Sequence, residues 1–545
     1  MAGGPSAAVV DEPPGLPPHR ESGNDSEPTS PSGGDLNTGH SATPNQHDVP
    51  RSSVAKSTLW NFLGQTAPIP VALIAIPILV RALGTDRFGI LTLAWALVGY
   101  FGLFDLGLGR ALTKIVAERI GRGRTDGIST VVWTGVYLTI GLGIGAALLV
   151  GILTPRIVQT LLKVPAPLQA ETQQAFLILA ASIPLVTGHA GLRGVLEAWH
   201  RFDLTNAVRL PVGVLTFVAP LLVLPLSHRL PGVVASLACV RLLGFAIQLG
   251  LALRFVPALR RSLKPSSSEV SSLLRFGGWM TVSNLVGPLM VTLDRFVIGS
   301  LVSVSAVAYY ATPYEVITKL WLVSGALVGV LFPTFASTVG RDETRTARLF
   351  HQGLKALVLA LFPLCLLAVI FASEALTVWL GFEFASKSAI VLQVLALGVF
   401  VNSLATVPFA LIQGGGRPDL TAKIHAIELP FYLGSLWLLV HGLGVVGAAI
   451  AWSARVIVDA AILFTVAERS FTRGDRWLRI LIPALTAALL VAAILAGSAS
   501  LLAKTIVAAV LLAAFYRVVE SYLITGEDRL FIVHGLRSLR GHQRT

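Results

Sequence analysis

Long apolar blocks recur along most of this 545-residue chain, and only short polar stretches separate them. An α-helix of about 20 apolar residues is long enough to cross the hydrocarbon core of a bilayer. The pattern therefore predicts an all-α polytopic membrane protein with about fourteen transmembrane helices. The predicted spans are residues 57–80, 88–108, 130–153, 172–193, 207–227, 232–253, 276–299, 306–337, 351–373, 388–412, 420–440, 443–467, 479–497 and 501–525.

The composition agrees with a membrane protein and changes the meaning of the net charge. Hydrophobic residues make up 54% of the chain and charged residues only 13%, whereas soluble domains carry roughly 25% charged residues. The net charge is +13, but most Arg and Lys residues lie at the ends of apolar blocks. They therefore indicate contact with membrane lipids and not with nucleic acid. Cys239 and Cys365 lie within apolar blocks and are predicted to be small core residues.

Basic residues in the connections between blocks predict the topology. If residues 1–52 are cytoplasmic, the basic connections that fall on the same side are 110–124, 254–264, 341–348 and 469–479, together with the tail from Arg529. The opposite connections hold severalfold fewer Arg and Lys residues. The positive-inside rule then places both termini in the cytoplasm, joined by an even number of spans.

The chain divides into a polar tail and a duplicated apolar region. Residues 1–52 are rich in Pro, Gly and Ser, so we predict a disordered cytoplasmic tail. Further on, residues 201–205 (RFDLT) match 417–421 (RPDLT), and GVV occurs at both 232–234 and 444–446. These matches predict two parallel six-helix lobes, as in transporters built from repeats. The predicted divisions are lobes at 53–264 and 270–470, a helix pair at 476–526 and a basic cytoplasmic tail at 527–545.

Charged residues in or near the predicted spans are the candidate site, because a charge at the bilayer centre is costly unless it faces protein or water. The basic candidates are Arg295, Arg241, Arg209, Lys319, Arg455, Arg110 and Lys114, and the acidic candidates are Asp294, Asp459, Glu315 and Asp105. Glu315 and Lys319 are spaced i, i+4, as are Arg455 and Asp459, so each pair shares a helix face.

Two interpretations of these charges stay open. In the first, the i, i+4 pairs are self-neutralising contacts that hold helices together. In the second, the Arg and Lys side chains line a cavity and bind anionic phosphate, because guanidinium pairs well with phosphate oxygens. The carboxylates then balance charge or couple transport to H+ or Na+. The positive-inside rule alone is enough to explain Arg110 and Lys114.

The chain lacks the motifs of several enzyme classes. It contains no Walker A loop, no Asp-x-Asp pair, no Gly-x-Ser-x-Gly elbow and no His/Cys metal cluster. The predicted loops are also too short to hold an extramembrane catalytic domain. We therefore expect a protein that is not an enzyme, with no catalytic residue, no resident metal and no cofactor.

Four segments carry a family resemblance: 60–64 (WNFLG), 81–89 (RALGTDRFG), 104–111 (FDLGLGRA) and 413–419 (QGGGRPD). With them, residues 53–470 resemble the Wzx-type O-antigen flippases of polysaccharide biosynthesis, in the MOP superfamily that also holds MATE exporters and the lipid II flippase MurJ. The resemblance implies two six-helix lobes around a cationic cavity. It implies translocation of undecaprenyl-diphosphate-linked oligosaccharide across the bacterial cytoplasmic membrane by alternating access. It also implies a polysaccharide polymerase and export machinery as partners.

Two other functions are weighed against a flippase. A MATE-like exporter of small cations needs acidic cavity residues that no Arg offsets, and the spans of this chain show the reverse. A membrane-embedded glycosyltransferase or polymerase needs a sizeable outer loop with catalytic residues, and the predicted outer loops are short. The sequence leaves open the sugar, the coupling ion, the oligomeric state and the role of the N-terminal tail.

Overall fold

The structure, a computed structural model, describes Gly64 and residues 66–103, 107–123, 126–471, 476–497 and 499–523. Throughout these ranges the secondary structure is helical, which confirms the all-α prediction. The elements are α2 (Pro68–Leu103), α3 (Leu108–Gly121), α4 (Ile128–Arg156), η1 (Ile157–Leu161), α5 (Ala166–Ala198), α6 (Phe202–Val223), α7 (Leu230–Phe255), α8 (Ala258–Arg261), α9 (Ser267–Leu301), α10 (Val304–Ile317), η2 (Thr318–Leu320), α11 (Trp321–Thr338), α12 (Glu343–Ile370), α13 (Ala372–Leu380), α14 (Phe382–Gly414), α15 (Pro418–Ser470), α16 (Arg476–Ala496), α17 (Leu501–Val518) and η3 (Val519–Leu523).

Ten helical segments in the described part of the chain are long and apolar enough to cross a membrane. Of these, α15 contains two of the predicted spans, and α2 overlaps two others, 57–80 and 88–108. The apolar segment Ile480–Ala496 of α16 is shorter than the ten. The protein is therefore a multi-pass membrane protein as predicted, whereas the number fourteen stays a prediction.

A bend at one glycine takes the place of a loop in both long helices. Gly84 in α2 has a φ of 77°, and Gly444 in α15 has a φ of 59°. Residues with a Cβ atom are strained at positive φ, whereas glycine adopts it readily. In each case the helix changes direction at one glycine close to a predicted boundary between spans. Gly444 is also a member of one of the two GVV matches.

Most helices extend beyond the predicted spans. The fourth predicted span is 172–193, and α5 covers Ala166–Ala198. Hydropathy marks the part of a helix inside hydrocarbon, while helical hydrogen bonding continues into the polar regions on either side.

The two cysteines differ in burial, although both were predicted to be core residues. Cys365 is buried as predicted, but Cys239 is exposed, because a membrane helix presents small apolar side chains to lipid as well as to the core.

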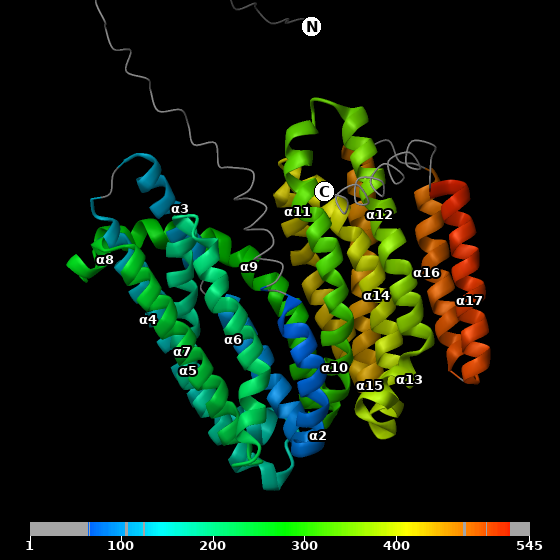
Figure 1. The fold of residues 1–545 in the computed structure, drawn as a ribbon, viewed down its shortest axis with the longest axis horizontal. Coiled ribbons are helices and arrows are strands. Elements are labelled where there is room, and N and C mark those ends of the chain that lie inside the picture. Colours follow the sequence, from blue (N-terminus) through cyan, green and yellow to red (C-terminus); the bar gives the residue numbers. More distant parts are fainter. Residues whose placement is uncertain are drawn as a thin grey trace, which may run out of the picture. The chain divides into compact units, whose positions relative to one another are not determined.

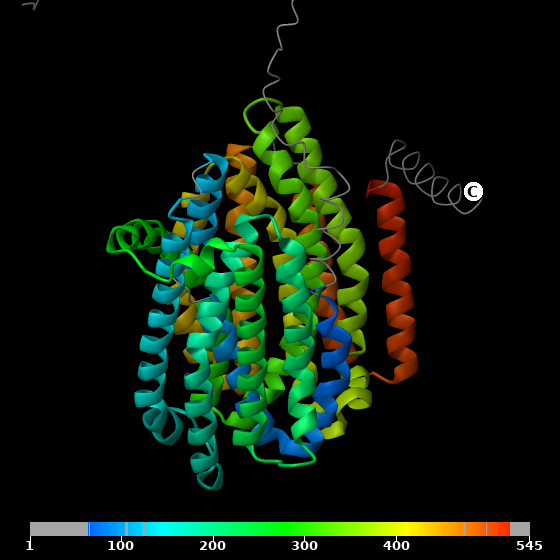
Figure 2. The ribbon, with the colours of Figure 1, turned by 60° about the vertical axis from the view of Figure 1, so that its left-hand side comes forward.

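The described helices belong to one compact unit and pack in two neighbourhoods. In the first, α5 packs on α4 and α7, and α6 packs on α7; in the second, α11, α12 and α15 all pack on α14 (Figures 1 and 2). Helix α2 joins the two, since it contacts α5 and α6 as well as α9 and α10. The lobe boundaries at 53–264 and 270–470 stay a prediction.

Small residues allow the two neighbourhoods to approach closely. A Cβ atom at Gly89 in α2 would collide with the carbonyl oxygen of Val304 at the start of α10. Nearby, the backbone N–H of Lys163 donates to the carbonyl of Gly299 at 2.9 Å, which ties the α4–α5 connection to the end of α9. Close contact through glycine is a common way for membrane helices to associate.

The Arg- and Lys-rich connections gather at one end of the helices. In Figure 1, α3, α8 and the connection between α11 and α12 lie at the top, and we call this the basic end. The α4–α5 connection, the α6–α7 connection and α13 lie at the bottom, which we call the opposite end. The gathering agrees with the charge-based topology. Which end faces the cytoplasm stays a prediction.

The C-terminal helices α16 and α17 are attached to the bundle by packing and by one buried ion pair. Helix α16 packs on α12 and α14, and α17 packs on α12. Near the start of α17, the Lys504 ammonium lies 2.6 Å from a carboxylate oxygen of Glu374 in α13, and only 6% of the Lys504 side chain is exposed. A buried charge is stable only when it is paired, so this contact fixes where α17 meets α13.

The bend in α15 gives a stability prediction. We expect Gly444→Ala to lower the free energy of unfolding by about 1–3 kcal/mol, because the substitution forces a Cβ atom into a strained backbone conformation. Gly442→Ala is the matched control, since a Cβ atom there meets nothing within 4 Å and φ is ordinary. Thermal unfolding of the purified protein in detergent measures both. Equal melting temperatures for the two variants would show that the bend is not strained.

Candidate functional site

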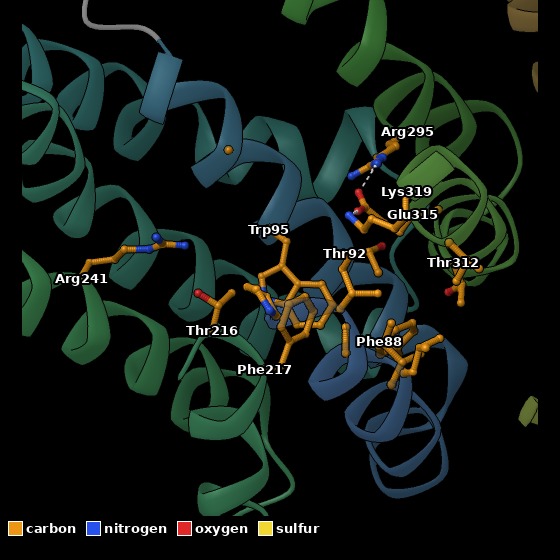
Figure 3. A pocket seen from close by; sticks show the side chains of 18 residues that line it. Phe88, Thr92, Trp95, Thr216, Phe217, Arg241, Arg295, Thr312, Glu315 and Lys319 are labelled. Atoms are coloured by element: carbon orange, nitrogen blue, oxygen red, sulfur yellow. Dashed lines mark hydrogen bonds and ion pairs between the residues drawn. The ribbon is translucent and has the colours of Figure 1, made fainter. Parts of the chain in front are cut away.

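A pocket of about 330 Å³ lies between α2, α6, α7, α9 and α10 (Figure 3). One wall is apolar and aromatic, with Phe88 and Trp95 of α2 and Phe217 of α6. Trp95 and Phe217 meet edge to face, with ring centroids 5.3 Å apart. The charged groups that line the pocket are Arg241, Arg295, Glu315 and Lys319. The structure thus brings together four of the eleven residues predicted from sequence, from three different helices and η2.

Glu315 holds two of the three cations in the pocket. The Arg295 guanidinium lies 2.8 Å from one carboxylate oxygen of Glu315, and the Lys319 ammonium lies 3.2 Å from the other. The predicted i, i+4 pair of Glu315 and Lys319 is therefore present. Arg295 is 8% exposed in its side chain, and its guanidinium carbon lies 5.5 Å from the centre of the Tyr314 ring.

Arg241 faces the pocket from the other side, on α7. Figure 3 shows its guanidinium pointing toward Thr216, across the pocket from the Arg295–Glu315 pair. Within the described part of the chain, Arg241 forms no ion pair and no hydrogen bond. Three cations and one carboxylate leave the lining with an excess of two positive charges. A half-buried guanidinium without a partner is costly, so this arrangement favours an anionic ligand.

Asp294 is adjacent to Arg295 but points into the helix packing. It is fully buried. Its carboxylate accepts hydrogen bonds from the Tyr310 hydroxyl at 2.5 Å and from the backbone N–H of Arg295 at 2.7 Å. Consecutive helical residues lie about 100° apart around the axis, which is why two neighbouring charges reach different surroundings. Asp294 therefore does not line the pocket.

A further basic group lies on α5 and α6, beside Arg241. The predicted Arg209 is exposed on α6, within electrostatic range of Arg193 and Glu197. Arg193 forms an ion pair with Glu197 at 3.6 Å. His189 lies within electrostatic range of both Arg193 and Arg241. The sequence prediction missed Arg193 because it ends the predicted span 172–193, where an Arg fits the positive-inside rule.

Three more of the predicted residues lie at the basic end or outside the described residues. Arg110 and Lys114 belong to α3 at the basic end, where Lys114 lies 3.7 Å from Glu118 with both side chains exposed. That location favours their topological interpretation. Asp105 lies outside the described residues.

A second cluster of charges lies within α15, across the bend at Gly444. One of the two open interpretations paired Arg455 with Asp459, and the structure shows other partners for both. Arg455 instead lies 3.6 Å from Glu428, and Asp459 lies 3.5 Å from His425. The two halves of α15 face each other, so each side chain finds a closer partner on the other half than along its own helix.

This cluster leaves several buried polar atoms without hydrogen bonds. Both carboxylate oxygens of Glu428 and one of Asp459 lack a hydrogen-bond donor among the described residues. The Tyr432 hydroxyl also has no hydrogen-bond partner there. One ligand atom from each of His425, Glu428 and Asp459 lies within 4.8 Å of the others. Two carboxylates and the single cation of Arg455 leave one negative charge in excess. The arrangement could hold a proton or a metal ion. Glu428 was not among the residues predicted from sequence. Its position inside the span 420–440 could have indicated it, since an acidic residue within a span is rare.

Comparison with solved structures defines the class of protein. A multidrug resistance MATE family transporter of the MOP superfamily, in an inward-facing conformation, aligns with a TM-score of 0.61 and 17% identity over 78% of this chain and 98% of that one. A MOP superfamily transporter from Pyrococcus furiosus aligns with a TM-score of 0.55 and 16% identity over 79% of this chain and 96% of that one. The fold is therefore MATE-like, with the helix arrangement seen in these two transporters.

Sequence comparison defines the family. The model of the polysaccharide biosynthesis protein family matches residues 54–339. A Shigella flexneri protein named "Putative O-antigen transporter" is 32% identical over 416 residues, 75% of this chain and 97% of that protein. A "Probable low-salt glycan biosynthesis flippase" of Haloferax volcanii is 24% identical over 200 residues, 36% of this chain and 42% of that protein. The chain belongs to the polysaccharide biosynthesis protein family. The relatives in Shigella and Haloferax are named as a transporter and a flippase, and not as enzymes.

The different partners of the two pocket arginines give a stability prediction. We expect Arg295→Gln to lower the free energy of unfolding by about 1–3 kcal/mol, because Glu315 loses its buried partner and keeps only Lys319. Arg241→Gln removes a cation that has no partner among the described residues, so the free energy of unfolding should stay the same or rise. Thermal unfolding followed by tryptophan fluorescence compares the two. An equal loss of stability in both variants would contradict the assignment of partners.

Proposed function

We propose that this protein is a flippase that translocates undecaprenyl-diphosphate-linked oligosaccharide across the cytoplasmic membrane for cell-surface polysaccharide synthesis. The observation that carries the proposal is the pocket with three cations and one carboxylate, in which Arg241 has no partner among the described residues. A diphosphate offers the opposite charge and the oxygen geometry that guanidinium groups bind best. The names of the relatives in Shigella and Haloferax support a glycan-related substrate.

The pocket offers different surfaces to the different parts of such a substrate. Arg241 and Arg295 lie on α7 and α9, so a diphosphate between them would contact both helix neighbourhoods. Trp95 of α2 and Phe217 of α6 form an aromatic wall of the pocket. The less polar face of a sugar ring can pack on such a wall. The anion would then compete with Glu315 for Arg295 and Lys319.

We propose transport by alternating access between the predicted lobes 53–264 and 270–470. The contacts of Gly89 with Val304 and of Lys163 with Gly299 lie toward the opposite end, and they tie the two neighbourhoods together there. A pocket closed at that end would receive its substrate from the basic end. If the basic end is cytoplasmic, as the charge distribution predicts, both termini are cytoplasmic and substrate enters from the side on which it is made.

The coupling cation, H+ or Na+, is a separate part of the proposal. The charge cluster of His425, Glu428 and Asp459 has one negative charge in excess once Arg455 is counted, and an added cation would balance it. Arg455 also lies 4.0 Å from the sulfur of Met290 in α9, the helix that carries Arg295. A change of charge in the cluster could therefore shift Arg455 against α9 and so move Arg295 in the pocket.

A MATE-like exporter of small cations is the alternative, and the same pocket argues against it. A cationic solute would meet an excess of two positive charges in the lining. Likeness to MATE structures shows the fold alone.

Contact with a polysaccharide polymerase and export machinery is a further part of the flippase proposal.

Transport measurements on reconstituted protein test the flippase proposal. We expect Arg241→Gln to lower translocation of a labelled undecaprenyl-diphosphate oligosaccharide by about 10- to 100-fold, because a charge-assisted hydrogen bond contributes about 1.5–3 kcal/mol. Arg254→Gln is the matched control, since Arg254 is exposed in the last turn of the same helix and lies outside the pocket lining. Wild-type protein that moves no lipid-linked oligosaccharide but exports a cationic dye would sink the proposal.

Imposed ion gradients across the vesicles test the coupling site. We expect an H+ or Na+ gradient to speed translocation by wild-type protein, and Glu428→Gln and Asp459→Asn to remove most of that response, because each takes away the charge that binds the cation. Asp419→Asn is the matched control in α15, since Asp419 pairs with Arg417 and Lys423 in exposed positions. A full gradient response in both cluster variants would rule out the cluster as the coupling site.

A further inference from the structure

A second cavity, larger than the pocket, lies between α14, α15 and α16, with a volume of about 790 Å³. We call it the α15–α16 groove. Most of its lining is apolar and comes from three helices, for example Leu397 of α14, Ile457 and Phe464 of α15, and Ile482 and Leu490 of α16. Ile457 and Leu490 are among the large hydrophobic side chains that stay exposed. Water is poorly held in such an apolar space, so a different occupant is expected.

Polar groups of the groove concentrate toward the end of α15. Thr465, Glu468 and Arg469 line it there, and Arg469 is exposed in the last turn of the helix. Glu468 has an interaction partner of its own. In sequence, Arg473, Arg476 and Arg479 follow directly, in the basic connection that the charge distribution predicts to be cytoplasmic. The groove lining is therefore apolar along most of its length, with Arg469 as its cation at one end.

The groove and the pocket share no lining residue. Helix α15 stands between the groove and the charge cluster: Asp459 contributes to the cluster, whereas Ile457 and Ala461, two residues away on either side, line the groove. Positions two residues apart lie about 200° apart around a helix. An occupant of the groove therefore contacts the face of α15 directed away from the charge cluster.

We infer that the α15–α16 groove binds an anionic phospholipid, with an acyl chain along the apolar lining and the headgroup phosphate at Arg469. An acyl chain matches an apolar space that opens among membrane helices. Arg469 supplies the charge complementarity, because Arg and Lys near a leaflet attract anionic headgroups. Helix α16 packs on α12 and α14, so the bound chain would fill the space between α16 and α15. Lipid binding here does not depend on the proposed transport function.

Native mass spectrometry of the full chain in detergent tests this inference, with phosphatidylglycerol and phosphatidylethanolamine of matched chains as probes. Ala461→Phe and Ala487→Phe fill the groove from α15 and from α16. We expect each to lower the affinity for phosphatidylglycerol by about tenfold or more. Excluding two methylene groups of the acyl chain from the groove is enough for a change of that size. Ala484→Phe is the matched control, because Ala484 is exposed on α16 outside the groove lining.

The headgroup contact is tested by a variant that leaves the groove open. We expect Arg469→Gln to reduce the preference for phosphatidylglycerol over phosphatidylethanolamine by about fivefold, with little change in phosphatidylethanolamine binding. Equal lipid binding by the groove-filling variants and Ala484→Phe would overturn the inference. So would displacement of phosphatidylglycerol by an equimolar polyprenyl phosphate, which would make the groove a substrate site. Because no arm measures translocation, its outcome is independent of the flippase proposal.

Discussion

The cost of holding charge away from water is the constraint on which the rest of this structure depends. Inside the described helices, the most deeply buried cations are held in ion pairs. Glu315 holds Arg295 and Lys319, Glu374 holds Lys504, and Glu428 holds Arg455. Arg241 departs from this pattern because it lines a pocket without a partner among the described residues. That departure is the strongest link between the physics of the bilayer and a transport function.

The same constraint separates the molecule into regions with different tasks. The pocket between α2, α6, α7, α9 and α10 has an excess of positive charge, whereas the cluster in α15 has an excess of negative charge. Arg455 and Met290 connect the cluster to α9, which carries Arg295. On the other side of α15 lies an apolar groove. One bent helix thus borders a charged interior and a surface suited to lipid, so the bend at Gly444 bears on both.

The candidate site was only partly predictable, and the reasons are local. Arg295 and Arg241 stood out because each lies within an apolar block, where a charge needs an explanation. Their convergence on one pocket could not be read from the chain, since α7 and α9 meet the pocket from different sides. The Arg455–Asp459 pairing failed because helix spacing considers one helix at a time, and the bend brings Glu428 and His425 closer. His189 was missed because histidine carries no fixed charge.

The sequence by itself determined the membrane class, the helical fold and the approximate places of the apolar helices, because each depends on the length of an apolar block. Those are local properties that the bilayer imposes on any chain. The tertiary structure decided which helices are continuous through a glycine, which charges pair, and which cation stays unpaired at a pocket. Those depend on packing between helices far apart in the chain, and hydropathy contains no information about such contacts.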